Sequence, residues 1–312
     1  MSVWLPTSPC TPEACAGHEG STASIPRAVL RLTAAVALIL LGILGAPPVR
    51  LLPAGPRHTV VRAWSAALVR AFGIRITVHG SPGPGGGRLL VPNHISWLDI
   101  PLVAAAVPCR MLAKSDILDW PVLGRLAGGA GTLFIERDKI RALPATVETV
   151  TGALLAGDRV TVFPEGSTWC GRAQGTFRRA AFQSALDARV PVQPVRLAYL
   201  HCDGTPAGAP AFVGDDPLTA SLWRIARARG VRAEVRLLPR IPPGRYAHRR
   251  DLAAAAQQAV LGASAPTLLP GIPAQPVAPS ATDKDSANRP AASVHHWVSS
   301  SPAAANSFRT PS

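Results

Sequence analysis

The sequence is poor in aromatic residues and in negative charge. Phe, Trp and Tyr make up only 5% of the 312 residues, and they do not alternate with the basic positions. A surface that stacks bases on aromatic rings is therefore not expected, and nucleic acid ranks last among possible partners. The 18 acidic residues are outnumbered by 32 lysines and arginines, which leaves a net charge of +14. This charge suits a negatively charged membrane surface or a phosphorylated small molecule.

Cysteines are also scarce, and their spacing matches no set of metal ligands. The five are odd in number and scattered along the chain: Cys10, Cys15, Cys109, Cys170 and Cys202. Such a set favours reduced thiols, as expected for a protein that faces the cytosol. The sequence therefore predicts no metal site.

Apolar segments, by contrast, are prominent. Hydrophobic residues make up 47% of the chain, and the mean hydropathy of +0.20 is high for a freely soluble protein. As a helix, the run from Ala28 to Ala46 would reach about 28 Å, just under the roughly 30 Å hydrocarbon core of a bilayer. A single membrane span and a half-inserted helix both fit this run. A signal peptide fits less well, because the preceding segment is long and contains Glu13 and Glu19.

The segments that flank this run do not settle its orientation. Basic residues stand on both sides of it: Arg27, Arg31, Arg50 and Arg57. The next segment places Val61, Trp64, Leu68 and Phe72 at helical spacing. Packing of this stripe against the core is one interpretation. A basic amphipathic helix on the membrane surface is the other.

From residue 74 onward, short apolar runs alternate with helical patterns. The expected strands cover 74–79, 88–91, 110–113, 132–135, 159–163 and 192–200. The expected helices cover 97–107, 116–128, 139–156 and 176–188. A final helix–strand pair is expected over 217–238. This alternation predicts an α/β domain with a mostly parallel central sheet flanked by helices, preceded by the hydrophobic membrane helix. We expect a disordered N-terminus over 1–24, a membrane-associating helical segment over 25–73, the α/β domain over 74–262, and a disordered Pro/Ala/Ser-rich tail over 263–312.

A histidine and an aspartate follow the apolar strand 88–91. His94 lies in the turn after this strand, and Asp99 opens the next helical segment. The aspartate can accept Nδ1–H of the histidine and leave Nε2 as a general base. The same pattern also fits a histidine that caps a turn and an aspartate that caps a helix, so the pair alone does not decide between these interpretations.

Two further strand ends carry polar residues, as expected where open α/β sheets build their sites. Arg137 follows the strand 132–135 and could bind a phosphate with two hydrogen bonds, or pair with a neighbouring acid. Pro164 ends the strand 159–163, so Glu165 is presented at its tip, and Gly166 allows backbone N–H groups to approach an anion. An ordinary turn would explain the same residues, although it would not need the glutamate.

Together these stretches resemble the glycerolipid acyltransferases, which acylate lysophosphatidic acid and related lysophospholipids. The resemblance runs from about Ile74 to Leu197, with four blocks in the family's order. The NHxxxxD block matches Asn93, His94 and Asp99; the strand-then-Arg block matches Phe134, Ile135 and Arg137; the FPEG block matches Phe163, Pro164, Glu165 and Gly166; and the proline-rich block matches Val190, Pro191 and Pro194. Lys114 and the pair Phe177-Arg178 stand where such enzymes carry similar basic pairs.

The resemblance implies an enzyme of phospholipid biosynthesis at the cell membrane, with its catalytic domain on the cytoplasmic side. It would move a fatty acyl group from acyl-CoA or acyl carrier protein to 1-acylglycerol-3-phosphate, giving phosphatidic acid, without a metal or bound cofactor. His94 and Asp99 would be catalytic. The implied substrate-binding residues are Arg137, Glu165, Gly166, Asn93, Lys114 and Arg178.

One departure concerns the acceptor. Many members that use lysophosphatidic acid follow FPEG with Thr-Arg-Ser, whereas this chain has Ser167-Thr168-Trp169. Arg172 or Arg178 could replace the missing arginine. Another lyso-lipid, such as a lyso-ornithine lipid, is the nearer alternative acceptor. A non-catalytic membrane lipid-binding protein is the more distant one, and the intact His94–Asp99 pair argues against it.

Overall fold

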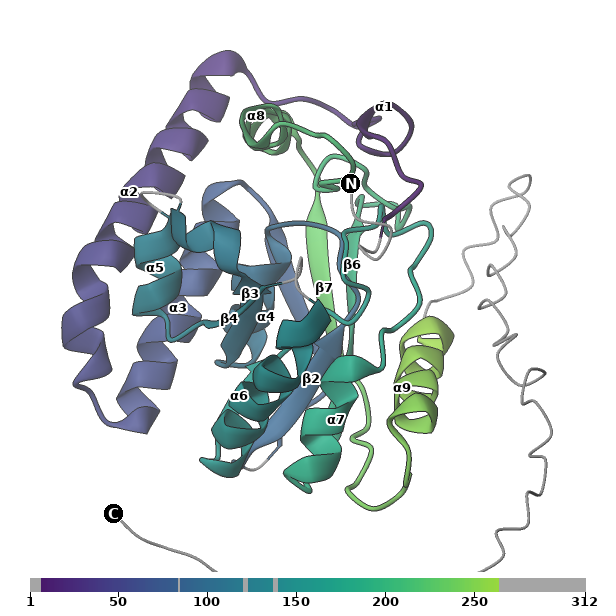
Figure 1. Ribbon diagram of the computed structural model, residues 1–312. Coiled ribbons are helices and arrows are strands. Elements are labelled where there is room, and N and C mark those ends of the chain that lie inside the picture. The colour runs from purple at the N-terminus through teal and green to yellow at the C-terminus, as the bar shows by residue number, and fades with distance from the viewer. Residues whose placement is uncertain (1–6, 84, 120–122, 137–139, 264–312) are drawn as a thin grey trace, which may run out of the picture. The chain divides into compact units, whose positions relative to one another are not determined.

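The short apolar runs of the sequence pair as one sheet in the computed structural model, which describes residues 7–83, 85–119, 123–136 and 140–263. Within these ranges, seven strands follow the order β1-β7-β6-β2-β5-β3-β4 (Figure 1). They are β1 (Arg75–His79), β2 (Arg88–Pro92), β3 (Arg110–Lys114), β4 (Leu133–Ile135), β5 (Arg159–Thr161), β6 (Val192–Leu200) and β7 (Arg232–Leu237). Strands β6, β2, β5, β3 and β4 are parallel neighbours, whereas β7 runs antiparallel to β6 and parallel to β1. The predicted mostly parallel α/β fold is confirmed.

Helices cover both faces of this sheet (Figure 1). They are α1 (Pro12–Cys15), α2 (Ile25–Arg50), α3 (Ala54–Ala71), α4 (Asp99–Ala106), α5 (Leu123–Gly129), α6 (Leu143–Leu155), α7 (Ala180–Asp187), α8 (Leu218–Arg227) and α9 (Arg249–Gly262). Side chains alternate between the two faces along a strand. Leu90 of β2 therefore belongs to the core beneath α2, α3, α4 and α8, while Leu89 and Val91 pack with α6, α7 and α9.

Three elements differ from the sequence prediction. The expected helix 116–128 is a short 3₁₀ helix (Ser115–Asp119) followed by α5, and the expected helix 139–156 begins as a 3₁₀ turn (Ile140–Ala142) before α6. Helix α9 was not predicted at all. Its buried positions include two alanines, Ala253 and Ala256, and alanine gives a weak periodic signal because it buries little apolar area.

Part of the N-terminal segment is packed, although the sequence led us to expect disorder over 1–24. Cys10, Ala16 and Ala23 are buried, and the N–H of Ala23 donates to the carbonyl of Arg227 at 2.6 Å. Small residues pack closely without an apolar periodicity, so the pattern gave no sign of this contact. Residues 1–6 and 264–312 lie outside the described residues, and the prediction for the tail stays a prediction.

Helix α2 lies along the α/β domain. Near its start, the Arg31 guanidinium donates to the carbonyls of Ala226 and Ala228 at 2.8 and 2.7 Å. Near its end, Arg50 Nε donates to Gly129 at 2.8 Å. The predicted stripe on α3 packs against this helix and the core, because Leu68 and Phe72 are buried and Trp64 Nε1 donates to the Leu38 carbonyl at 2.8 Å. Most of α2 is exposed and apolar, since only 11% of the residues in its most apolar 18-residue stretch are buried.

Candidate active site

The turn between β2 and α4 holds a histidine and an aspartate in direct contact. His94 Nδ1 lies 2.9 Å from Asp99 Oδ2. The same oxygen accepts the backbone N–H groups of Ile95 at 2.6 Å and Ser96 at 2.9 Å. Asp99 is the first residue of α4, where the helix dipole favours negative charge. The aspartate is thereby fixed, and it holds Nδ1 as the protonated nitrogen of the His94 ring.

A tyrosine from β6 gives Asp99 a fourth hydrogen bond. The Tyr199 hydroxyl donates to Asp99 Oδ1 at 2.8 Å, and the Asp99 side chain is fully buried. Burial, and then the charge of Asp99, raise the pKa of Tyr199 well above its usual value, so the hydroxyl keeps its proton. A buried carboxylate is costly unless donors satisfy both oxygens, and here four donors do so.

The loop after β5 supports the other side of the histidine. The ring of Phe163 stacks on the His94 ring, with centroids 4.0 Å apart, and the N–H of Trp169 donates to the His94 carbonyl at 2.8 Å. The His94 side chain is 16% exposed, and none of the described residues forms a hydrogen bond with its Nε2. The free nitrogen can therefore take a proton from a substrate hydroxyl.

Asn93 fixes this turn to β6, although the sequence suggested that it binds substrate. Its Nδ2 donates to the Leu197 carbonyl at 3.1 Å, and its Oδ1 accepts the Leu197 N–H at 2.7 Å. The side chain is 1% exposed. The amide oxygen and nitrogen of Asn93 both bond to the backbone of Leu197. Asn93 therefore positions the neighbouring His94 and does not face a substrate.

Glu165 is buried rather than presented at the strand tip. It is 2% exposed, and its oxygens form no hydrogen bond of ordinary geometry with a described residue. Burial raises the pKa of Glu165 to about 9, against the lowering effect of the His94 and Gly175 backbone N–H groups. The carboxyl is therefore neutral at pH 7. Gly166 makes this inward turn possible, because its φ of 75° suits glycine.

The remaining predicted residues lie at the same edge of the sheet or outside the described ranges. Because β2, β3 and β5 are parallel neighbours, their carboxyl ends meet at one edge. Lys114 ends β3 and pairs with Asp116 at 2.5 Å. Arg178 is exposed, and its backbone N–H donates to the Pro164 carbonyl at 2.7 Å. Arg137 lies outside the described residues.

Comparison with known proteins places this geometry in a family. The family model named Acyltransferase matches residues 75–198. A lyso-ornithine lipid O-acyltransferase of Pseudomonas aeruginosa is 38% identical over 215 residues, which cover 68% of this chain and 82% of that protein. The chain belongs to the acyltransferase family. A 1-acyl-sn-glycerol-3-phosphate acyltransferase of Neisseria gonorrhoeae is 36% identical over 57% of this chain and 70% of that protein.

A solved structure shows the same fold. The crystal structure of the 1-acyl-sn-glycerophosphate (LPA) acyltransferase of Thermotoga maritima superposes with a TM-score of 0.57, at 19% identity, over 77% of this chain and 98% of that chain. The predicted family and the predicted O-acyltransferase activity are confirmed. The relatives divide between two acceptors, as the departure after FPEG suggested.

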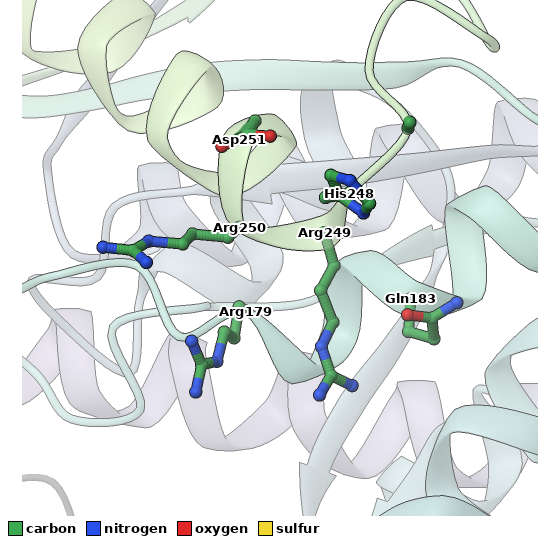
Figure 2. A pocket seen from close by; sticks show the side chains of 7 residues that line it. Arg179, Gln183, His248, Arg249, Arg250 and Asp251 are labelled. Atoms are coloured by element: carbon green, nitrogen blue, oxygen red, sulfur yellow. The ribbon is translucent and has the colours of Figure 1, made fainter. Parts of the chain in front are cut away.

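The acyltransferase also carries a basic pocket that shares no residue with the histidine–aspartate turn. This pocket of about 760 Å³ lies between the start of α7 and the start of α9. Figure 2 shows the side chains of Arg179, Arg249 and Arg250 around it. We place the active site at His94 and not here, because this pocket holds no buried, oriented base.

Tyr199 and Trp169 belong to the active site of this acyltransferase but were not predicted to do so. Tyr199 reaches Asp99 because β6 pairs with β2, in a register that places Val195 beside Pro92. Neither that pairing nor the register can be read from local sequence. Trp169 acts through its backbone N–H, so its side-chain type carried no signal. The alternation of Val195, Leu197 and Tyr199 on one face was the available hint.

Proposed function

We propose that this acyltransferase moves a fatty acyl group from a thioester donor, acyl-CoA or acyl carrier protein, to the free hydroxyl of a lysophospholipid. The proposed acceptor is 1-acylglycerol-3-phosphate, and the product is phosphatidic acid. The observation that carries this proposal is the His94–Asp99 pair, in which Nδ1 is engaged and Nε2 is free. Relatives named for 1-acyl-sn-glycerol-3-phosphate support the acceptor.

In the proposed reaction, His94 acts on the acceptor directly. Its Nε2 takes the proton of the acceptor hydroxyl while that oxygen attacks the thioester carbonyl. Asp99 stabilises the imidazolium that forms. When the carbon–sulfur bond breaks, the imidazolium returns the proton to the leaving thiol, so the products are an ester and a free thiol. The thioester itself is the activated group, and we therefore propose no metal or bound cofactor for this step.

The acceptor phosphate is the proposed ligand of Arg137, whose planar guanidinium matches phosphate with two hydrogen bonds. Lys114, which is paired with Asp116, and Arg178 are the other basic side chains that we propose near this phosphate. Gly166 and the neutral carboxyl of Glu165 shape the loop beside His94. Because Glu165 is buried, we assign it to this loop and not to a direct contact with the phosphate.

A lyso-ornithine lipid is the second candidate acceptor. The Pseudomonas relative named for it is 38% identical over 82% of its own length. Thr168 stands where many enzymes that use lysophosphatidic acid carry arginine, and its hydroxyl donates to the Phe212 carbonyl. The side chain thus holds a neighbouring loop and supplies no positive charge to a phosphate.

A panel of lyso-lipid acceptors tests this proposal. We expect the full-length enzyme in detergent to acylate 1-acylglycerol-3-phosphate with a higher kcat/KM than lyso-ornithine lipid or lysophosphatidylethanolamine. Each acceptor is supplied in turn with acyl-CoA and with acyl carrier protein, and product is measured by mass spectrometry. A higher kcat/KM for lyso-ornithine lipid would show that this lipid, the second candidate, is the preferred acceptor. Hydrolysis of the thioester without any acylated lipid would contradict both.

The variant Arg137→Ala adds an arm to this test. Two charge-assisted hydrogen bonds contribute about 1.5–3 kcal/mol, so KM for 1-acylglycerol-3-phosphate should rise about 10- to 150-fold. The phosphate does not react, so kcat should fall less than KM rises. Arg137→Lys should recover only part of the loss. Unchanged acceptor KM with weakened donor binding would place the arginine on the donor side.

We propose that α2 is half-inserted in the cytoplasmic face of the membrane. Arg31 and Arg50, near its two ends, both bond to carbonyls of the same domain. A helix that crossed a roughly 30 Å core could not keep both ends on a domain at one surface. The cytoplasmic side is proposed because acyl-CoA and acyl carrier protein are available there. The exposed apolar residues of α2 that would enter the bilayer include Val29, Leu30, Val36, Leu40, Leu41 and Leu44.

We expect Leu44→Glu to weaken binding to lipid vesicles. Leu44 is 76% exposed, and burial of a leucine in the bilayer contributes about 1.5–3 kcal/mol, or about 10- to 150-fold in partitioning. Leu155 of α6 is 68% exposed and provides a matched control, because Leu155→Glu should leave vesicle binding unchanged. Co-sedimentation with anionic vesicles measures both. Equal loss in the two variants would show that α2 is not the membrane-facing element.

A further inference from the structure

Three of the five cysteines meet at one place, although the sequence scatters them. The thiol sulfurs of Cys10, Cys15 and Cys170 all lie within 4.8 Å of one another. A tetrahedral metal ion bound at about 2.3 Å from each thiolate needs sulfurs about 3.8 Å apart. The sulfurs therefore need to approach one another by at most about 1 Å to close around one ion.

The three residues come from two segments that are far apart in the chain. Cys10 precedes α1 and Cys15 ends it, while Cys170 follows the Phe163–Gly166 turn. Cys10 and Cys170 are buried, and Cys15 is half-buried.

We propose that Cys10, Cys15 and Cys170 form a binding site for one thiol-seeking divalent ion, Zn²⁺. Each thiol loses its proton on binding, so three protons leave as the ion enters, and water takes the fourth position. The other two cysteines stand apart from this site. Cys109, just before β3, accepts a hydrogen bond from the Thr161 hydroxyl of β5, and Cys202 is exposed.

The ion would tie the N-terminal segment to the loop that supports His94. Gly171, which follows Cys170, packs closely against the Ile95 side chain, because a Cβ added at Gly171 would lie 3.0 Å from it. Ile95 directly follows the catalytic histidine in the chain. The N-terminal segment packs closely against the loop that contains Gly208. A Cβ added at Gly208 would lie only 2.7 Å from the Cys15 carbonyl oxygen. The loop that contains Gly208 also reaches the histidine turn, because the Phe212 N–H donates to Ile95 at 3.0 Å. The proposed ion therefore joins these two segments and takes no part in the acyl-transfer chemistry.

Metal titration of the full-length protein tests this site without reference to its activity. The protein is purified in detergent under a phosphine reductant, stripped with a chelator, and titrated with Co²⁺ as a coloured substitute for Zn²⁺. We expect one Co²⁺ per chain, with thiolate-to-cobalt absorption in the near ultraviolet that Zn²⁺ then abolishes. Cys10→Ser and Cys170→Ser should each weaken binding by more than the about 10- to 100-fold that loss of an outer-shell partner costs, because each removes a ligand itself. Cys202→Ser is the matched control and should bind as the wild type does.

Three results would overturn the proposal. The first is a folded wild-type protein that shows no thiolate-to-cobalt absorption. The second is wild-type affinity in Cys170→Ser. The third is a disulfide between two of these cysteines in the isolated protein. It would overturn the proposal if the thiols obtained by reducing it did not bind the ion. His94→Ala should retain full metal binding, so that a failed acyltransferase assignment and a failed metal site remain distinguishable.

Discussion

Replacement of His94 by alanine should lower kcat by about 10²- to 10⁴-fold, which is the usual contribution of a positioned general base. Nε2 is the only nitrogen of this ring that is left for a substrate, because Nδ1 is held by Asp99. Stability should fall by about 1–3 kcal/mol, because the mostly buried ring also gives up its hydrogen bond to Asp99 and its stacking contact with Phe163. Single-turnover kinetics at saturating acceptor and donor would measure the effect, with thermal unfolding as the check on folding.

His79→Ala is the matched control for this experiment. His79 is exposed at the end of β1, at the opposite edge of the sheet order from β4, and its removal should leave kcat unchanged. Near-normal turnover by a stably folded His94→Ala enzyme would contradict the mechanism. So would an acyl-enzyme that hydroxylamine traps, because the proposed base acts on the acceptor hydroxyl and leaves no covalent intermediate.

The structure argues against a serine nucleophile as well. Ser96 is the hydroxyl nearest to the base in sequence, but it is fully buried. Its Oγ accepts the backbone N–H of Leu98 at 3.2 Å, and its own N–H donates to Asp99. The residue therefore shapes the turn that carries the histidine. A substrate carbonyl could not reach its hydroxyl without unfolding that turn.

The catalytic pair was predictable because its chemistry is local. His94 and Asp99 are five residues apart, and a strand followed by a helix brings them together without any long-range contact. The FPEG loop was predictable as a second part of the site, since parallel strands place their carboxyl ends at one edge. The sequence did not show that the two loops touch. The order β6-β2-β5, with β5 directly beside β2, makes that contact.

Residues whose role depends on register could not be predicted. Asn93 was expected to face the substrate, but its amide pairs with the backbone of Leu197, more than a hundred residues away. The burial of Glu165 was missed for a related reason, because the protein around a turn, and not the turn itself, decides whether a side chain points inward. The cysteine cluster joins residues 10 and 170, and no spacing rule covers such a distance.

Replacement of Asp99 by asparagine should lower kcat by about 10²- to 10³-fold while the histidine keeps its orientation. Three donors meet at the Oδ2 position, namely His94 Nδ1 and the N–H groups of Ile95 and Ser96. These donors should select the carbonyl oxygen of the new amide. Its NH₂ group then faces the Tyr199 hydroxyl, which can rotate its proton away and accept.

The expected loss in Asp99→Asn is therefore a loss of charge and not of tautomer. At an effective dielectric constant of about 20, a unit charge about 4 Å from the imidazolium contributes about 4 kcal/mol, which sets an upper limit near 10³-fold. Tyr199→Phe removes one donor and keeps the charge, so its effect should be smaller. In the double variant with His94→Ala, Asp99→Asn should lower kcat no further than His94→Ala alone does, because the Asp99 charge acts only through the histidine. Multiplicative losses in the double variant would show that Asp99 contributes to the reaction by a route independent of His94.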